Sequence, residues 1–355
     1  MKRKVNKIRE YFEQKKEMND LLVNFIESTD EIEIYFYYLQ NYIEKSKICE
    51  KKEELEYFLR LLSNVSNNYH RKPGFFTKIE KILVYLDQSI RKILPKNDLF
   101  NIFLKNKIVL LLLFKNGMIT LEETFIEYLI NSGESELPRY RHFFLPEITK
   151  FISDKKRIEI ENEILNFDKM NLEKYDEKRL KGENDSYICS LIREDLIDEF
   201  VTYYNRGHFS LNSKIEPSVF ETNSFLIGKK PTLIEYSAFY GSIQIFNFLK
   251  LNDVELEPSL WLYSIHSKNA ELIHLLEENQ VEPFDETYEE CLEESIKCHH
   301  NDIAVYIMDN LFKPIEEKPK NTANHQAYQK YSDFQMSTEE RIISYAFKYS
   351  NYKFF

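Results

Sequence analysis

Residues 231–310 read PTLIEYSAFYGSIQIFNFLKLNDVELEPSLWLYSIHSKNAELIHLLEENQVEPFDETYEECLEESIKCHHNDIAVYIMDN. Pro231 and Pro258 each begin a unit, and they stand 27 residues apart. A third unit fits at an offset of 31 residues, which pairs Ser264 with Ser295 and leaves a few extra residues in the loop before it. A fixed period of about 20 to 50 residues is typical of stacked repeats. The stretch therefore predicts three copies of one structural unit.

Each unit is predicted to be a pair of short antiparallel helices. Apolar and small residues recur at helical spacing in the first helix, as Ile234, Ser237 and Ala238 do. A serine returns at positions 237, 264 and 295, and its small side chain lets neighbouring helices approach closely. A lone helical pair of this length is marginal in water. The units are therefore expected to be stable only as an array, in which neighbours bury each other's apolar faces.

The composition indicates a folded protein that is rich in helix. The chain has 355 residues, of which 43% are hydrophobic and 30% are charged, and this length suits two domains or one elongated array. The low content of 7 Gly and 10 Pro disfavours all-β folds and nucleotide-binding loops. The net charge of −11 disfavours nucleic-acid binding. The basic start, residues 2–9, is interpreted as the solvated face of a first helix, with a targeting segment or a patch for an anionic surface as the alternative.

The cysteines and the hydropathy pattern bear on the compartment. Cys49, Cys189, Cys291 and Cys298 are scattered, as in intracellular proteins with free thiols. The first residues lack the apolar core of a signal peptide. The most apolar run, Ile108–Phe114, is far shorter than the roughly 20 residues that cross a bilayer. We expect a cytoplasmic protein, with the nucleus as the alternative, and no membrane span.

The N-terminal half carries helical patterns without a fixed period. One buried helix is expected over residues 98–114 and a loop over residues 138–146. The charged stretch 169–184 is the candidate domain boundary. Ser/Thr-x-x-Glu capping boxes predict four helix starts along the chain, at Ser28, Thr77, Thr120 and Ser337.

The central units resemble ankyrin repeats. The ankyrin pattern Thr-Pro-Leu-His-x-Ala-Ala-x-x-Gly corresponds here to residues 232–241, which read TLIEYSAFYG. The pair Phe248-Leu249 and the turn at residues 252–255 follow it, as in that pattern. The wording is similar to a large family of divergent protist ankyrin-repeat proteins of unassigned function, in segments such as PSLWLYSIHSKN, YEECLEESIKCHHNDIA and NNYHRKPGFFTKIEKIL. The resemblance is strong over half of the chain and weaker over most of the rest.

The chain departs from the ankyrin pattern in three respects. Proline precedes Thr232 and Ser259 instead of following them. The histidine of the pattern is replaced by Glu235, Leu262 and Glu293. The units are also shorter than the roughly 33 residues of an ankyrin repeat. The loops that form β-fingers in ankyrin repeats are therefore expected to be short here.

The resemblance implies an all-α, elongated helical-hairpin solenoid, with ankyrin-like repeats preceded by an irregular N-terminal helical domain. The expected parts are an N-terminal all-helical domain (1–180), divergent ankyrin-like repeats (185–312), a flexible polar insertion (313–337) and a terminal repeat helix (338–355).

The resemblance also implies a surface for a protein partner. The fifth and eighth positions of the ankyrin pattern face the concave side of the array. Aromatic side chains with a polar group are favoured at such interfaces. Trp261, at the fourth position, is expected in the core. The residues expected to bind the partner are Tyr236, Phe239, Tyr263, His266, Glu294 and Lys297.

No motif in the sequence predicts catalysis or a cofactor. Cys291, Cys298, His299 and His300 lie close together, but no Cys-x-x-Cys pair accompanies them. We interpret the cysteines as small core residues and the histidines as a helix end, where a cation suits the helix dipole. No glycine-rich elbow surrounds a Ser or Cys, and no nucleotide-binding glycine motif exists. No metal or cofactor is therefore expected.

The leading functional hypothesis is a non-enzymatic protein-interaction module or scaffold. It depends on the repeat pattern and on the missing catalytic motifs. The first alternative is a structural or regulatory subunit that self-associates through its N-terminal helices. The second alternative is an enzyme, which would contain a deep pocket with convergent polar groups and perturbed pKa values.

Overall fold

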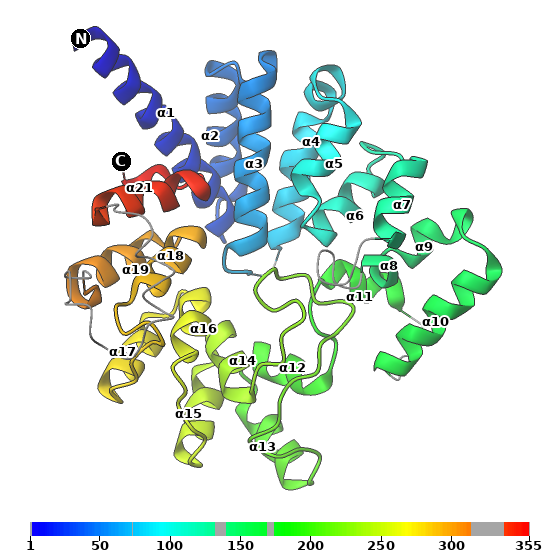
Figure 1. Ribbon diagram of the computed structural model, residues 1–355, viewed down its shortest axis with the longest axis vertical. Coiled ribbons are helices and arrows are strands. Elements are labelled where there is room, and N and C mark those ends of the chain that lie inside the picture. The colour runs from blue at the N-terminus through cyan, green and yellow to red at the C-terminus, as the bar shows by residue number, and fades with distance from the viewer. Residues whose placement is uncertain (1, 73, 132–139, 169–173, 314–336, 355) are drawn as a thin grey trace, which may run out of the picture. The chain divides into compact units, whose positions relative to one another are not determined.

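The computed structural model describes residues 2–72, 74–131, 140–168, 174–313 and 337–354 (Figure 1). These residues form helices joined by turns and loops, and no β-strand occurs among them. A single antiparallel bridge joins Lys214 and Thr232. The all-α prediction is therefore confirmed for the described residues. No helix among them combines the length and the apolar character needed to cross a bilayer.

The chain divides into two units by its spatial contacts. Unit 1 comprises residues 1–21, 192–212 and 233–355, and unit 2 comprises residues 22–191 and 213–232. Two helices run from one unit into the other, α1 (Lys2–Glu27) and α12 (Tyr187–Arg193). The sequence-based boundaries at residues 180 and 185 were drawn along the chain and stay predictions.

Unit 2 is a group of helices around an apolar centre. Its most apolar helix is α6, in which residues 108–113 are all buried. α6 contacts α4 and α5, and α3 contacts both of these as well. The helices of unit 2 are α2 (Ile32–Lys45), η1 (Ile48–Glu50), α3 (Lys52–Asn68), α4 (Phe75–Ile93), α5 (Lys96–Phe103), α6 (Lys107–Lys115), α7 (Glu123–Asn131), α8 (Tyr140–Phe143), α9 (Leu145–Ile148), η2 (Thr149–Phe151), α10 (Asp154–Asp168) and α11 (Tyr175–Lys181).

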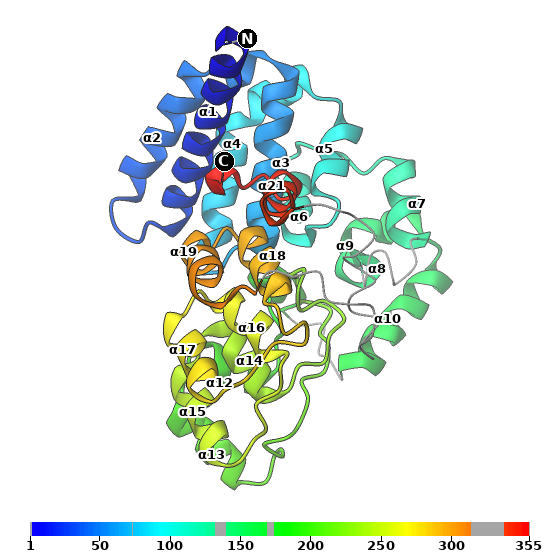
Figure 2. The same cartoon turned by 60° about the vertical axis from the view of Figure 1, so that its left-hand side comes forward.

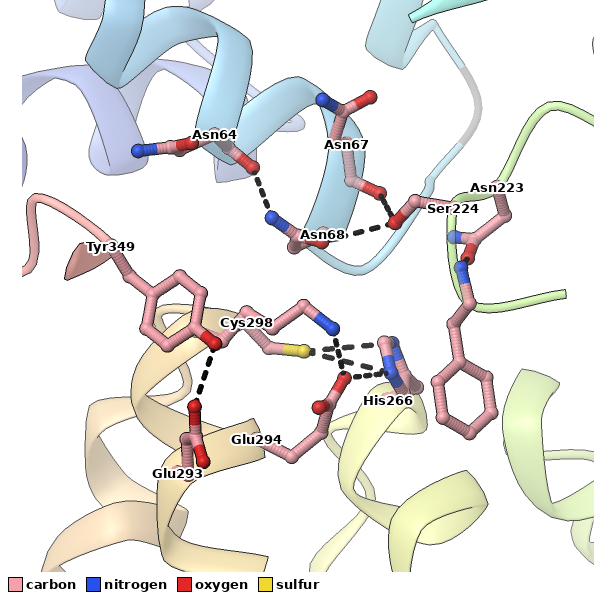
Figure 3. A network of polar contacts seen from close by, with 12 residues as sticks. Asn64, Asn67, Asn68, Asn223, Ser224, His266, Glu293, Glu294, Cys298 and Tyr349 are labelled. Atoms are coloured by element: carbon pink, nitrogen blue, oxygen red, sulfur yellow. Dashed lines mark hydrogen bonds and ion pairs between the residues drawn. The ribbon is translucent and has the colours of Figure 1, made fainter. Parts of the chain in front are cut away.

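Polar contacts connect the non-helical segment 213–232 of unit 2 to residues far away in sequence. Arg71 Nη1 donates to the Gly182 carbonyl at 3.1 Å and to the Thr222 hydroxyl at 2.9 Å. Ser224 Oγ donates to Asn68 Oδ1 at 3.1 Å (Figure 3). Gly182 itself is required there, because its φ is +69° and a Cβ would collide with Ile108 and lie 2.7 Å from the Thr222 hydroxyl.

The prediction of one helix over residues 98–114 is wrong, because the helix is interrupted between α5 and α6. Asn106 is buried at the break and caps α6, with its Oδ1 accepting from Val109 N at 3.0 Å. Its Nδ2 donates to Ser66 Oγ at 2.9 Å. The loop expected over residues 138–146 is also wrong for its described part, which contains α8 and the start of α9.

The capping-box predictions have mixed outcomes. The box at Ser337 is confirmed, because its side chain accepts from Glu340 N and the Glu340 side chain accepts from Ser337 N. The box at Ser28 is wrong, since Ser28 Oγ donates to the Phe25 carbonyl and α2 begins without a side-chain cap. The box at Thr77 is wrong because α4 begins at Phe75. The box at Thr120 is wrong as well, because α7 begins at Glu123 and not directly after Thr120.

Unit 1 consists of helical hairpins. Each of the three sequence units forms two helices: α14 (Leu233–Tyr240) with α15 (Ile243–Leu251), α16 (Leu260–Ser267) with α17 (Ala270–Glu278), and α18 (Glu289–Lys297) with α19 (Asn301–Tyr306). A further helix, α13 (Ile197–Asn205), precedes them and contacts α15. The last elements of unit 1 are η3 (Ile307–Leu311), α21 (Thr338–Lys348) and η4 (Tyr352–Phe354).

The first helices of the hairpins pack in sequence order. α14 contacts α16, α16 contacts α18, and α18 contacts α21, as both ribbon views show (Figures 1 and 2). The recurring serines at positions 237, 264 and 295 are fully buried. Trp261 is also fully buried, as predicted, and its Nε1 donates to the Val281 carbonyl at 2.6 Å. Whether these hairpins are ankyrin-like in detail stays a prediction.

The start of the chain packs against the last helix of unit 1. The ring of Phe12 lies 5.8 Å from that of Phe347 and 5.7 Å from that of Tyr352. Lys353 Nζ lies 3.9 Å from Asp20 Oδ2. The predicted flexible insertion 313–337 lies outside the described residues, apart from its two end residues.

Candidate functional site

The six residues expected to bind a partner all lie in the hairpins of unit 1. Tyr236 and Phe239 lie on α14, Tyr263 and His266 on α16, and Glu294 and Lys297 on α18. The first four are buried. The last two are partly exposed, with 14% and 23% of their side-chain surface accessible. Their role in partner binding stays a prediction.

A polar cluster joins α16 to α18 (Figure 3). His266 Nε2 donates to Glu294 Oε1 at 2.8 Å, and Lys297 Nζ donates to the same oxygen at 2.8 Å. Cys298, the residue after α18, places its Sγ 3.5 Å from His266 Nδ1 and 3.8 Å from His266 Nε2. We call His266, Glu294, Lys297 and Cys298 the α16–α18 cluster.

Burial and charge together set the protonation of the cluster. Burial alone would raise the pKa of Glu294, but the hydrogen bond and charge of His266 and the charge of Lys297 lower it to about 2. Burial lowers the pKa of Lys297, and the Glu294 carboxylate more than offsets this and raises it. Burial raises the pKa of the Cys298 thiol well above its ordinary range. At neutral pH the cluster therefore holds an ion pair beside a protonated thiol.

One aromatic ring contacts this cluster, and two tyrosines lie on the first helices α14 and α16. The ring of Phe239 stacks on His266 with centroids 5.0 Å apart. Tyr236 accepts a hydrogen bond from Arg193 Nη1 at 3.0 Å. Burial raises the pKa of Tyr263, and the nearby Glu235 carboxylate raises it further. Tyr263 is therefore a neutral phenol within the hairpin array.

The group of cysteines and histidines weighed in the sequence does not converge as a set. His299 is buried and places Nε2 3.2 Å from the Tyr349 carbonyl, and burial lowers its pKa to about 4. His300 places Nδ1 2.7 Å from the Ile265 carbonyl. Within the described part of the chain, Cys298 is the member of this set that joins a group able to hold a metal ion, together with His266 and Glu294.

The sequence contained a signal for this cluster that its local motifs hid. His266 and Cys298 stand 32 residues apart, so they lie in different repeats and form no short ligand motif. The offset of 31 residues pairs His266 with Lys297, which places both at the ends of neighbouring first helices. Stacking of the second hairpin on the third then brings His266 against the last turn of α18.

The cluster has the residue types of a cysteine nucleophile with its base, but its geometry does not suit that reaction. A sulfur on the lone-pair axis of Nδ1 would lie much farther from Nε2 than from Nδ1. The two measured distances are nearly equal, 3.5 and 3.8 Å, so Sγ lies beside the ring. A buried thiol with a raised pKa is also a poor nucleophile. The cluster therefore lacks the features of an activated cysteine.

We compared the chain with family models, curated proteins and solved structures. No family model, no curated protein and no solved structure matches it.

Proposed function

We propose that this chain is a non-enzymatic protein-interaction module, in which the helical hairpins of unit 1 present a surface to a protein partner. The observation that carries the proposal is the ordered packing of α14, α16, α18 and α21. Arrays of stacked hairpins are stabilised mainly between neighbours and offer extended surfaces to partners. The ankyrin resemblance of residues 231–310 supports the same proposal.

Polar contacts connect each first helix to the next one and support a rigid array. Ser259 Oγ donates to Glu235 Oε1 at 2.6 Å between the first and second hairpins. The His266–Glu294 hydrogen bond connects the second hairpin to the third. Tyr345 Oη donates to Glu289 Oε1 at 2.8 Å between α18 and α21. A rigid surface binds a partner with a smaller loss of conformational entropy.

Two large apolar side chains give the proposal a testable surface. Leu251 ends α15 and is 80% exposed, and Phe284 lies in the loop before α18 and is 70% exposed. Both lie where one hairpin connects to the next. Apolar and aromatic side chains at such places are the anchors that partner surfaces commonly bury.

The test is capture of protein partners from the native cell, followed by mass spectrometry. The variant Leu251→Ser/Phe284→Ser is compared with the matched control Val84→Ser/Ile158→Ser, whose parent residues are exposed in unit 2. We expect the first variant to lose about tenfold or more of each specific partner, a loss of about 1.4 kcal/mol in binding, and the control to retain it. Equal capture by both variants, or a wild-type chain that retains no specific protein, contradicts the proposal.

The buried tyrosines need a milder change, because removing a buried ring destabilises the fold. Tyr236→Phe and Tyr263→Phe remove only the hydroxyl groups and preserve the apolar volume. If the predicted concave residues bind the partner, these variants weaken capture while the melting temperature changes little. Unchanged capture by both variants would remove these two tyrosines from the interface.

A further inference from the structure

We propose that His266, Glu294 and Cys298 form a binding site for a divalent transition-metal ion of the zinc type, held between α16 and α18. The site would use an imidazole nitrogen, a carboxylate oxygen and a thiolate sulfur. Zinc is bound in proteins by these three ligand types. This inference goes beyond the proposed partner binding and does not depend on it.

The ligand atoms are already close together. His266 Nε2 and Glu294 Oε1 are 2.8 Å apart, Cys298 Sγ lies 3.5 and 3.8 Å from the two imidazole nitrogens, and the three residues offer ligand atoms that all lie within 4.8 Å of one another. In a tetrahedral zinc site with bonds of about 2.0 to 2.3 Å, ligand atoms lie about 3.3 to 3.7 Å apart. The nitrogen and oxygen therefore have to separate by about half an ångström. The imidazole ring also has to rotate, since Sγ now lies beside it.

The charges of the three ligands match a divalent cation. The Glu294 carboxylate is ionised at neutral pH, and the Cys298 thiolate would supply a second negative charge. A buried pair of negative charges requires compensation of equal size. Once His266 has released the proton whose charge lowers the pKa of Glu294, it contributes a neutral nitrogen, so a divalent ion would leave the three-ligand site without net charge. The donor set therefore favours a dication over a monovalent one.

Lys297 would compete with the metal ion. Its ammonium group donates to Glu294 Oε1 at 2.8 Å and so occupies the carboxylate. Because 23% of its side-chain surface is accessible, the ammonium group can leave toward solvent when a metal ion enters. The partly exposed edge formed by Glu294 and Lys297 is also the route by which an ion would reach the buried sulfur.

Metal binding must release a proton from the thiol. Burial raises the pKa of Cys298, and the neighbouring Glu294 carboxylate raises it further, whereas Lys297 lowers it. Among the described residues, the titratable groups that face the site also include His266, and Tyr349 acts on Lys297 and raises its pKa. Since the ligands are a thiolate and an imidazole nitrogen without its proton, the apparent affinity is expected to rise with pH, by up to about tenfold per pH unit for each proton that binding releases.

The test is titration of the reduced full-length protein with Co²⁺, whose optical spectrum reports its ligands. The expected result is a near-ultraviolet sulfur-to-cobalt charge-transfer band together with visible bands of four-coordinate intensity. Cys298→Ser is expected to abolish the charge-transfer band. Cys291→Ser is the matched control, because Cys291 is equally buried on α18 and lies outside the cluster, and it is expected to keep the band.

Two further variants keep the proposal testable if Cys298→Ser folds poorly. Glu294→Gln is expected to weaken cobalt binding about tenfold or more, equivalent to about 1.4 kcal/mol. Lys297→Gln is expected to strengthen it by a similar factor, because the competing cation is gone. Absence of a charge-transfer band in the wild-type protein overturns the proposal. An unchanged band in a folded Cys298→Ser variant also overturns it, because the ion is then bound elsewhere.

Discussion

Replacing Arg341 with leucine would remove the cation that faces a buried carboxylate in unit 1. Glu289 is only 2% exposed and forms an ion pair with Arg341 Nη1 at 2.8 Å. Its other oxygen accepts from Tyr345 Oη at 2.8 Å. Burial raises the pKa of Glu289 above its ordinary 4.5, since desolvation outweighs the hydrogen bond from Tyr345 and the charge of Arg341. These contacts hold α21 against α18, so the substitution tests how α21 is held.

The magnitude follows from two limits. Removing one partner of a buried ion pair costs about 3 to 5 kcal/mol when the other charge stays buried. Protonation of Glu289 limits this cost, because one pKa unit corresponds to about 1.36 kcal/mol. Since the folded pKa already exceeds 4.5, the limit lies below about 3.4 kcal/mol at pH 7 and below about 0.7 kcal/mol at pH 5. We therefore expect Arg341→Leu to lower the free energy of unfolding by about 3 kcal/mol at pH 7.

The sign of the pH dependence is the sharper part of this prediction. A carboxyl group with a raised folded pKa favours the folded state most at low pH, where it is protonated, and loses this contribution as the pH rises through the folded pKa. The penalty of Arg341→Leu relative to the wild type is therefore expected to shrink below about 1 kcal/mol at pH 5.

The assay is denaturant unfolding at both pH values, followed by tryptophan fluorescence. Trp261 is the chain's single tryptophan, and its ring lies 5.0 Å from that of Tyr288, the residue before Glu289. The control Glu289→Gln/Arg341→Leu carries no buried charge, so its penalty should be smaller at pH 7 and independent of pH. An equal penalty for Arg341→Leu at both pH values, or a double variant that is as unstable at pH 7, would refute the reasoning.

Further substitutions test single contacts. Gly182→Ala should lower the free energy of unfolding of unit 2 by about 2 kcal/mol or more, because the φ of Gly182 is +69° and a Cβ has no room there. The control Gly207→Ala has a φ of +74° but open space around the Cβ, and it should cost about 1 kcal/mol. Both losses are measured by unfolding followed with circular dichroism. Trp261→Phe should cost about 1 to 3 kcal/mol in a thermal melt, because a buried carbonyl loses its donor. Asn106→Ala should cost about 1 to 2 kcal/mol in chemical denaturation through loss of the α6 cap, and a loss below 0.5 kcal/mol would contradict that role.

The repeated part of the fold could be predicted from the sequence because its signals are local. Serine, leucine and proline recur at fixed offsets in residues 231–310, and these offsets predict helical pairs of the observed kind. The capping box at Ser337 lies at the start of α21, where its side chain and that of Glu340 satisfy each other's backbone groups. Patterns of this kind depend only on residues within a few turns of one another.

The failed predictions have tertiary causes. A continuous apolar pattern predicted one helix over residues 98–114, but the buried Asn106 satisfies its side chain with Ser66 and begins a new helix. Ser28 matched a capping box, yet its hydroxyl bonds to the end of α1, and its carbonyl accepts from the buried Lys78. The same holds for the α16–α18 cluster, whose members come from separate repeats. Local patterns do not encode contacts between residues tens of positions apart.

The end of the hairpin array illustrates how a stacked fold solves its own edge problem. Each hairpin buries an apolar face against the next one, so the last hairpin of any array leaves one face uncovered. In unit 1 the last helix to join the stack is α21, whose Phe347 is half exposed although its ring contacts that of Phe12 on α1. Phe347 is therefore covered in part by Phe12, which is more than 300 positions away in the sequence, and a repeat pattern does not predict such a contact. The N-terminal part of α1 therefore packs on α21, much as a capping repeat packs on the last unit of a regular array.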